Sequence, residues 1–215
     1  MSRRVLLPVA VVLCLLLPAC GGAPQAAAPP VGAPALDPLA RPVQRDLAKP
    51  EEFLYSAGGS DYTVTKLADY SLCGIVVSVE NYYIDAGAAL APVDIATVFG
   101  QLAANDLWRK ISWSQHIRWY WWSYQYADIP GGNPFIVSNS SNNHIIPATP
   151  QLKAAARALQ PGAVIQLTGS LVSIAESGRP DGFHWQSSVT RDDTGDGSCE
   201  LIWLDELRCG QQVWR

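Results

Sequence analysis

The spacing of apolar positions along the chain predicts a domain in which strands and helices alternate. Apolar and polar side chains alternate over residues 71–84, which is typical of a strand with one buried face. Another apolar stretch covers residues 163–174, and its apolar positions change from odd to even numbers around Gly169. This change predicts a β-bulge or sharp bend at the glycine. Two more strands are expected over residues 183–189 and 199–207.

Two segments combine helical spacing of apolar residues with residues that commonly start a helix. Pro92 suits the first helical turn and Asp94 complements the positive end of the helix dipole, so a helix is predicted from Pro92 to Asn105. A Thr-Pro pair at residues 149–150 starts a second helix, which Gly162 ends. Taken together, these elements indicate an α+β fold.

Within that class we expect a small, partly open β-barrel of the OB-like kind with inserted helices. Such a barrel needs about five strands, and a strand bent at Gly169 would form one of its corners. A twisted sheet with helices packed on one face is the alternative.

The N-terminus resembles the signal peptide of a bacterial lipoprotein. Two arginines precede an apolar run over residues 5–17, which is too short to span a bilayer. The run ends in a segment that is similar to a lipobox, Leu17-Pro18-Ala19-Cys20-Gly21. The resemblance implies removal of residues 1–19 and attachment of a lipid such as palmitate to Cys20. A plain secretory signal cleaved at nearly the same place is the alternative.

The lipobox resemblance also implies a location and a layout for the chain. The protein would be a lipid-anchored protein of the cell envelope, on the periplasmic face of the outer membrane if the host has two membranes. This sorting follows because Gly21 stands where an aspartate would mark retention at the inner membrane. Residues 20–50 are rich in alanine, proline and glycine and are expected to form a flexible tether, followed by one globular domain over residues 51–215.

The charge balance excludes one large class of partners. The 215 residues include 15 lysines and arginines against 19 acidic residues, a net charge of −4, and loss of the two arginines in residues 1–19 makes it −6. Affinity for nucleic acid depends on neutralising phosphates, so no nucleic-acid partner is expected. Three cysteines remain besides Cys20, and in an oxidising envelope they predict one disulfide whose pairing among Cys73, Cys199 and Cys209 stays open.

An unusually aromatic segment covers residues 119–126, where six of eight side chains are Trp or Tyr. The segment is predicted to be a strand, and Trp121, Trp122 and Tyr124 are its candidate contacts to a ligand. Aromatic faces stack on sugar rings, so a glycan is the favoured partner; a peptide or another envelope protein is also considered. A core strand that packs against a neighbouring strand is the alternative explanation.

His144 is the main candidate for chemistry. It follows Asn143, and both are candidate ligand contacts together with Arg191. His144 would also suit a general base for a nucleophile at Ser188 or Cys199. In that arrangement Asp192 would orient the imidazole. No nucleophile elbow is present, and a structural histidine bonded to loop backbone remains the alternative.

Residues 192–197 superficially resemble a calcium-binding loop because Asp192, Thr194 and Asp196 stand at alternate positions. The glutamate required at the twelfth position is replaced by Trp203. A tight turn is therefore favoured, and neither a metal nor a cofactor is expected.

Much of the C-terminal half resembles a family of uncharacterised, often membrane-associated bacterial proteins. The resemblance is carried by an N-x-H-I-I-P segment at residues 142–147, a G-x-L-V strand at residues 169–172, and a W-x-S-S-x-T-R-x-D-T-G-x-G-x-C-E segment at residues 185–200. The family implies no particular activity. From the sequence we expect a non-catalytic binding or assembly module, with an envelope hydrolase that uses His144 and either Cys199 or Ser188 as the alternative.

Overall fold

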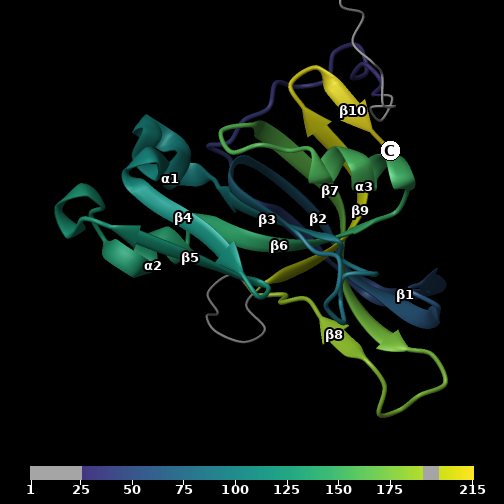
Figure 1. Cartoon of the computed structure of the whole chain (residues 1–215). Coiled ribbons are helices and arrows are strands. Elements are labelled where there is room, and N and C mark those ends of the chain that lie inside the picture. The colour runs from purple at the N-terminus through teal and green to yellow at the C-terminus, as the bar shows by residue number, and fades with distance from the viewer. Residues whose placement is uncertain (1–25, 191–198) are drawn as a thin grey trace, which may run out of the picture.

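The computed structural model describes residues 26–190 and 199–215 and is dominated by one large mixed sheet (Figure 1). The strands of this sheet are β1 (Val43–Ala57), β2 (Ser60–Asn81), β3 (Val93–Val98), β6 (Ser140–Pro147), β7 (Val164–Glu176), β8 (His184–Gln186), β9 (Glu200–Cys209) and β10 (Gln212–Trp214). A separate hairpin consists of β4 (Ile111–His116) and β5 (Trp119–Tyr124). The helices are α1 (Gly100–Ala103), the 3-10 helices η1 (Ala104–Lys110) and η2 (Tyr126–Asp128), α2 (Gly132–Val137) and α3 (Pro150–Arg157). The α+β class is therefore confirmed.

Strand pairing in the large sheet runs in the order β1-β2-β3-β6-β9-β7-β8, and β7 also pairs with β2. Pairing that starts at β2 thus passes through β3, β6, β9 and β7 and returns to β2. β6 and β9 are parallel, and the other pairs in this circuit are antiparallel. Side chains from all five strands and from α3 form the largest hydrophobic cluster, which includes Leu72, Ile95, Ile145, Leu167 and Ile202.

The bulge predicted at Gly169 is confirmed. The register between β7 and β9 shifts between Thr168 and Gly169. A Cβ atom added to Gly169 would lie 1.9 Å from the carbonyl oxygen of Trp203, so this close approach of two strands requires glycine.

Helix α3 is also confirmed. Its N-cap is Thr149, whose hydroxyl accepts a hydrogen bond of 3.2 Å from the backbone N–H of Leu152. Pro150 occupies the first turn, and Ala155 and Ala156 face the core with Leu152.

The helix predicted over residues 92–105 is wrong for most of its length. Strand β3 occupies Val93–Val98, and α1 is confined to the four residues after Phe99. β3 lies between β2 and β6 and all six of its residues are buried, so apolar side chains on both faces imitate helical spacing. Valine, isoleucine and threonine also favour the extended backbone of a strand.

The described N-terminal residues pack along the far end of β9 and β10. Ala27 and Val213 exchange two backbone hydrogen bonds, with N–O distances of 2.7 and 2.9 Å. Arg208 Nη2 donates to the carbonyl oxygen of Pro34 at 3.2 Å. Strand β1 then begins at Val43, so contacts with the sheet start within the segment expected to be a tether. Among the described residues, no helix has the length and apolar character needed to cross a membrane.

The structure does not show the expected disulfide: none of the three described cysteines is bonded to another. Cys73 is opposite Gln166 on β7, and Gln166 is opposite Arg208 on β9, so these three side chains share one face of the sheet. Cys209 follows Arg208 and therefore points to the other face. Cys199 immediately precedes β9, whereas Cys209 is its last residue, so the length of the strand, roughly 30 Å, separates these two cysteines.

Candidate functional site

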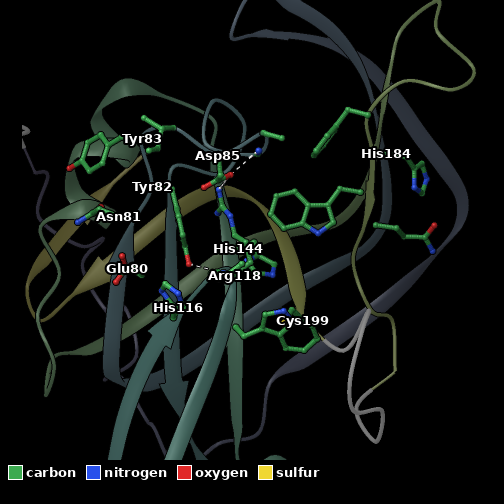
Figure 2. Close-up of a pocket in the computed structure, with 18 residues that line it drawn as sticks. Glu80, Asn81, Tyr82, Tyr83, Asp85, His116, Arg118, His144, His184 and Cys199 are labelled. Atoms are coloured by element: carbon green, nitrogen blue, oxygen red, sulfur yellow. Dashed lines mark hydrogen bonds and ion pairs between the residues drawn. The ribbon is translucent and has the colours of Figure 1, made fainter.

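A pocket of about 870 Å³ lies beside the turn of the β4–β5 hairpin (Figure 2). Its walls come from separate parts of the chain: the end of β2 with the following loop (residues 80–87), the hairpin turn (residues 116–119) and the β8 region (residues 183–186). His144 of β6 and Cys199 complete the lining. Three exposed apolar side chains stand among these residues, namely Tyr83, Ile84 and Ile117.

Arg118 reaches the pocket from the hairpin turn, where Ile117 and Arg118 both have positive φ angles of 50° and 67°. Its guanidinium Nη1 donates to Asp94 Oδ1 at 2.9 Å and to the carbonyl oxygen of Ala91 at 2.7 Å. Nη2 donates to Asp85 Oδ1 at 2.7 Å. The two ion pairs and the carbonyl hold the turn against β3 and the loop that precedes it.

Aromatic rings enclose this guanidinium. Its central carbon lies 3.6 Å from the ring centre of Tyr82 and 5.4 Å from that of Trp185. The backbone N–H of Arg118 donates to the Tyr82 hydroxyl at 3.0 Å. The same residue thereby uses both its side chain and its backbone to fix the position of Tyr82.

Asp94 and His144 form a buried pair at the base of the pocket. They are opposite each other on β3 and β6, and Asp94 Oδ1 lies 2.9 Å from His144 Nδ1, although the alignment is not that of a hydrogen bond. Asp94 is fully buried, and its Oδ2 has no hydrogen-bond partner among the described residues. The imidazole also packs on Trp185, with ring centres 4.7 Å apart. The arrangement leaves His144 Nε2 as the imidazole nitrogen that can face the pocket.

The Tyr82 phenol at this end of the sheet has a raised pKa. Burial raises the pKa of the Tyr82 phenol, and the charges of Asp94 and Glu80 raise the pKa further. The backbone N–H and the charge of Arg118 act in the opposite direction but do not cancel the increase.

The aromatic segment forms β5, as predicted, but its side chains divide between two faces. Tyr120, Trp122 and Tyr124 face inward and pack on a second hydrophobic cluster that includes Val98 and Leu102. Asn133 Oδ1 accepts hydrogen bonds from Trp122 Nε1 at 3.0 Å and from the Tyr124 hydroxyl at 3.1 Å.

The outward face of β5 carries Trp119 and Trp121. Trp121 is 59% exposed and does not line the pocket, whereas Trp119 does. The three candidate platform residues Trp121, Trp122 and Tyr124 therefore lie outside the pocket, and their role in ligand binding stays a prediction.

The remaining candidate residues are spread over different environments. Asn143 is fully buried and donates to the carbonyl oxygen of Ile95 at 2.8 Å, so it connects β6 to β3 rather than lining the pocket. The Ser188 hydroxyl donates to the carbonyl oxygen of Thr190 at 2.9 Å and is not part of the lining. Cys199 is half-buried and lines the pocket with His144. Cys20, Arg191 and Asp192 lie outside the described residues.

Three residues that shape the pocket were not predicted from the sequence. Asp94 was assigned to a helix start, Arg118 was not singled out, and Trp185 was noted only as the first residue of the motif at residues 185–200. The available clue was Asp94 itself, because a charged residue between Val93 and Ile95 in a buried segment needs a partner. The described residues contain no group of three or more His, Cys, Asp or Glu side chains placed to hold a metal ion.

Comparison with known proteins identifies no relative of this chain. No protein-family model, no curated protein and no solved structure matches this chain. The resemblance carried by the motifs at residues 142–147 and 185–200 therefore stays a prediction, and the interpretation of the site depends on its geometry.

Proposed function

We propose that this protein is a non-catalytic binding module of the bacterial cell envelope, and that its ligand enters the pocket beside the hairpin turn. The supporting observation is the pocket itself, an opening of about 870 Å³ bordered by aromatic rings above the buried Asp94–His144 pair. Pockets of this size, largely apolar with a few converging polar groups, are typical of small-molecule sites.

A finer description of the fold supports this position for the site. We propose that the circuit of β2, β3, β6, β9 and β7 is a small OB-like barrel, because the pairing returns to β2 and β6 pairs in parallel with β9. In such barrels the second and third strands and the loops after the first and fourth strands carry the ligand. The corresponding parts here are β3 and β6, residues 80–87, and the region around β8, which border or support the pocket.

Membrane attachment through a lipid on Cys20 is the second part of the proposal, and the lipobox-like segment at residues 17–21 supports it. The location would be the periplasmic face of the outer membrane in a host with two membranes. Expression of the full chain in bacteria followed by mass spectrometry tests it. An acylated N-terminal cysteine is expected, and Cys20→Ala should release the protein from the membrane fraction; an unmodified, soluble wild-type protein would contradict the anchor.

The pocket is tested with a matched pair of tryptophans. Trp119 and Trp121 lie on the same face of β5, but only Trp119 lines the pocket. After a screen of glycans, peptides and small metabolites, Trp119→Ala should weaken binding by roughly tenfold or more, as a central aromatic contact does. Trp121→Ala should leave the affinity unchanged. The reverse result would move the ligand to the exposed aromatic face of the hairpin, and a screen without ligands would contradict the proposal.

A hydrolase is the second candidate, and one observation favours it: His144 and Cys199 line the same pocket, and Asp94 lies beside the imidazole. A nucleophile, a base and an orienting carboxylate are the parts of a catalytic triad. Peptide-mapped alkylation separates the two candidates. Burial raises the pKa of Cys73 and of Cys209, so both thiols should react slowly at neutral pH. A binding module predicts that His144→Gln leaves the Cys199 rate unchanged; a large decrease would favour the hydrolase.

A further inference from the structure

Three ionisable side chains form a row across neighbouring strands at the pocket. Glu80 of β2 is opposite Asp94 of β3, and Asp94 is opposite His144 of β6, so the three side chains share one face of the sheet. Two carboxylates directly opposite each other on neighbouring strands repel and destabilise the pair, so a cation bound near them is favourable. Glu80, Arg118 and His144 all line the pocket, and in the view of Figure 2 the Tyr82 ring lies between Glu80 and the other two.

The guanidinium group that lines the pocket is already bonded to two carboxylates, neither of which is Glu80. Among the described residues that line the pocket, Arg118 is the only lysine or arginine. Its guanidinium is bonded to Asp85 and Asp94 at 2.7 and 2.9 Å. Glu80 makes no ion pair and no side-chain hydrogen bond with another described residue, although it is half-buried and lines the pocket. A second guanidinium lies behind this wall: Arg157 donates to the carbonyl oxygen of Tyr82 at 2.9 Å and lies 4.6 Å from the ring centre of Tyr83. The three carboxylates Glu80, Asp85 and Asp94 therefore outnumber the two guanidinium groups, and neither guanidinium is bonded to Glu80.

The field and the walls of the pocket agree with this excess of negative charge. Burial is the main reason for the raised pKa of the Tyr82 phenol, and the charges of Asp94 and Glu80 add to it while Arg118 opposes them. The ring of Tyr82 already holds the Arg118 guanidinium at 3.6 Å, which demonstrates the mode in which these walls receive a cation. His144 is nearly fully buried at the base, and its Nε2 has no described partner. Trp119 and Phe183 add further ring surface to the lining.

We infer that the pocket takes an organic cation: an ammonium or guanidinium group beside an apolar or ring-shaped body, with Glu80 as the carboxylate that receives it. This inference rests on the proposed binding function and narrows its ligand class. An anionic ligand would meet the uncompensated carboxylate. Two classes of ligand carry such a cation: peptides with basic side chains, and amino sugars.

Paired probes that differ only in charge provide the test, with the full chain and calorimetry or tryptophan fluorescence as the readout. The peptide arm compares an arginine-containing tripeptide with its citrulline analogue. The sugar arm compares glucosamine with N-acetylglucosamine. In at least one arm the cationic member should bind roughly tenfold more tightly, and Glu80→Gln should remove most of that difference, as expected for a charge-assisted contact.

Glu51→Gln is the matched control, because Glu51 is exposed on β1 and lies outside the pocket. The inference is overturned if no cationic probe binds better than its neutral partner, or if Glu80→Gln and Glu51→Gln behave alike. Failure of the inference is distinct from failure of the binding function: a neutral ligand that Trp119→Ala weakens and Glu80→Gln does not would leave the pocket as the binding site. The arm that responds identifies the source of the cation.

Discussion

The inner face of the β4–β5 hairpin and the pocket beside its turn are both rich in aromatic rings, but they differ in the polar atoms among those rings. On the hairpin, the polar atoms of the inward-facing rings have partners: Trp122 and Tyr124 share Asn133, and the Tyr120 hydroxyl lies 3.2 Å from the Ser140 hydroxyl. In the pocket, Asp94 Oδ2 and Arg118 Nε are buried without hydrogen-bond partners among the described residues. On the strands of the hairpin only Gln115 Oε1 of β4 is buried without a described partner, an amide oxygen, whereas the pocket leaves atoms of a carboxylate and a guanidinium without partners beside an open volume.

This difference explains why aromatic density along the chain is a poor guide to a binding site. Rings that are adjacent in the sequence alternate between the two faces of a strand, so half of them serve the core. The rings of the pocket, including Tyr82, Trp119 and Trp185, come from three distant segments and share one space only after folding.

The largest expected effect is on the pocket side of the comparison. Arg118→Met should lower the free energy of unfolding by about 3–5 kcal/mol, because it leaves the fully buried Asp94 carboxylate without its cation. Urea denaturation measures the loss. The double variant with Asp94→Asn should be more stable than Arg118→Met alone, since the unpaired charge is then gone. Equal or lower stability of the double variant would show that the ion pair is not the cause.

Substitutions on the inner face of the hairpin should lower the stability of the protein without changing its affinity for the ligand. Trp122 is half-buried against the second cluster, so Trp122→Ala should cost about 2 kcal/mol, roughly half the loss for a fully buried tryptophan. Trp121→Ala is the control on the same strand and should change stability by less than about 0.5 kcal/mol because the side chain is exposed. Thermal or urea unfolding gives both values. Loss of ligand affinity in Trp122→Ala without loss of stability would contradict the separation of the two regions.

The smallest expected effect concerns the turn that joins the two regions. Ile117 is 69% exposed and has a φ of 50°, a backbone conformation that a β-branched residue adopts only with strain. Ile117→Gly should therefore raise the free energy of unfolding by about 0.5–1 kcal/mol. Urea denaturation would detect this gain, and Ile117→Val provides the control because valine keeps the strain. Destabilisation by glycine would show that the turn is relaxed in the native protein.

Local signals in the sequence were reliable where a single segment decides its own conformation. The Thr-Pro start of α3 was predicted correctly because the cap hydroxyl and the first-turn proline act within four residues. The bulge at Gly169 was predicted from the change of parity, which reflects which side chains must face the core.

Where the tertiary environment of a segment decides its conformation, the sequence by itself was not enough to predict that conformation. Residues Val93–Val98 carry helical spacing, yet they form a central strand: β2 and β6 pair with its two edges, and its side chains are buried in one hydrophobic cluster on each face. The ion pairs of Arg118 with Asp85 and Asp94 follow from that strand and from a turn formed far along the chain. The sequence alone determined the α+β class, α3 and the bend in β7, because backbone preferences and the polarity of neighbouring residues act locally. The pocket was decided only by the tertiary structure, since electrostatic pairing and burial depend on distances that sequence separation does not reveal.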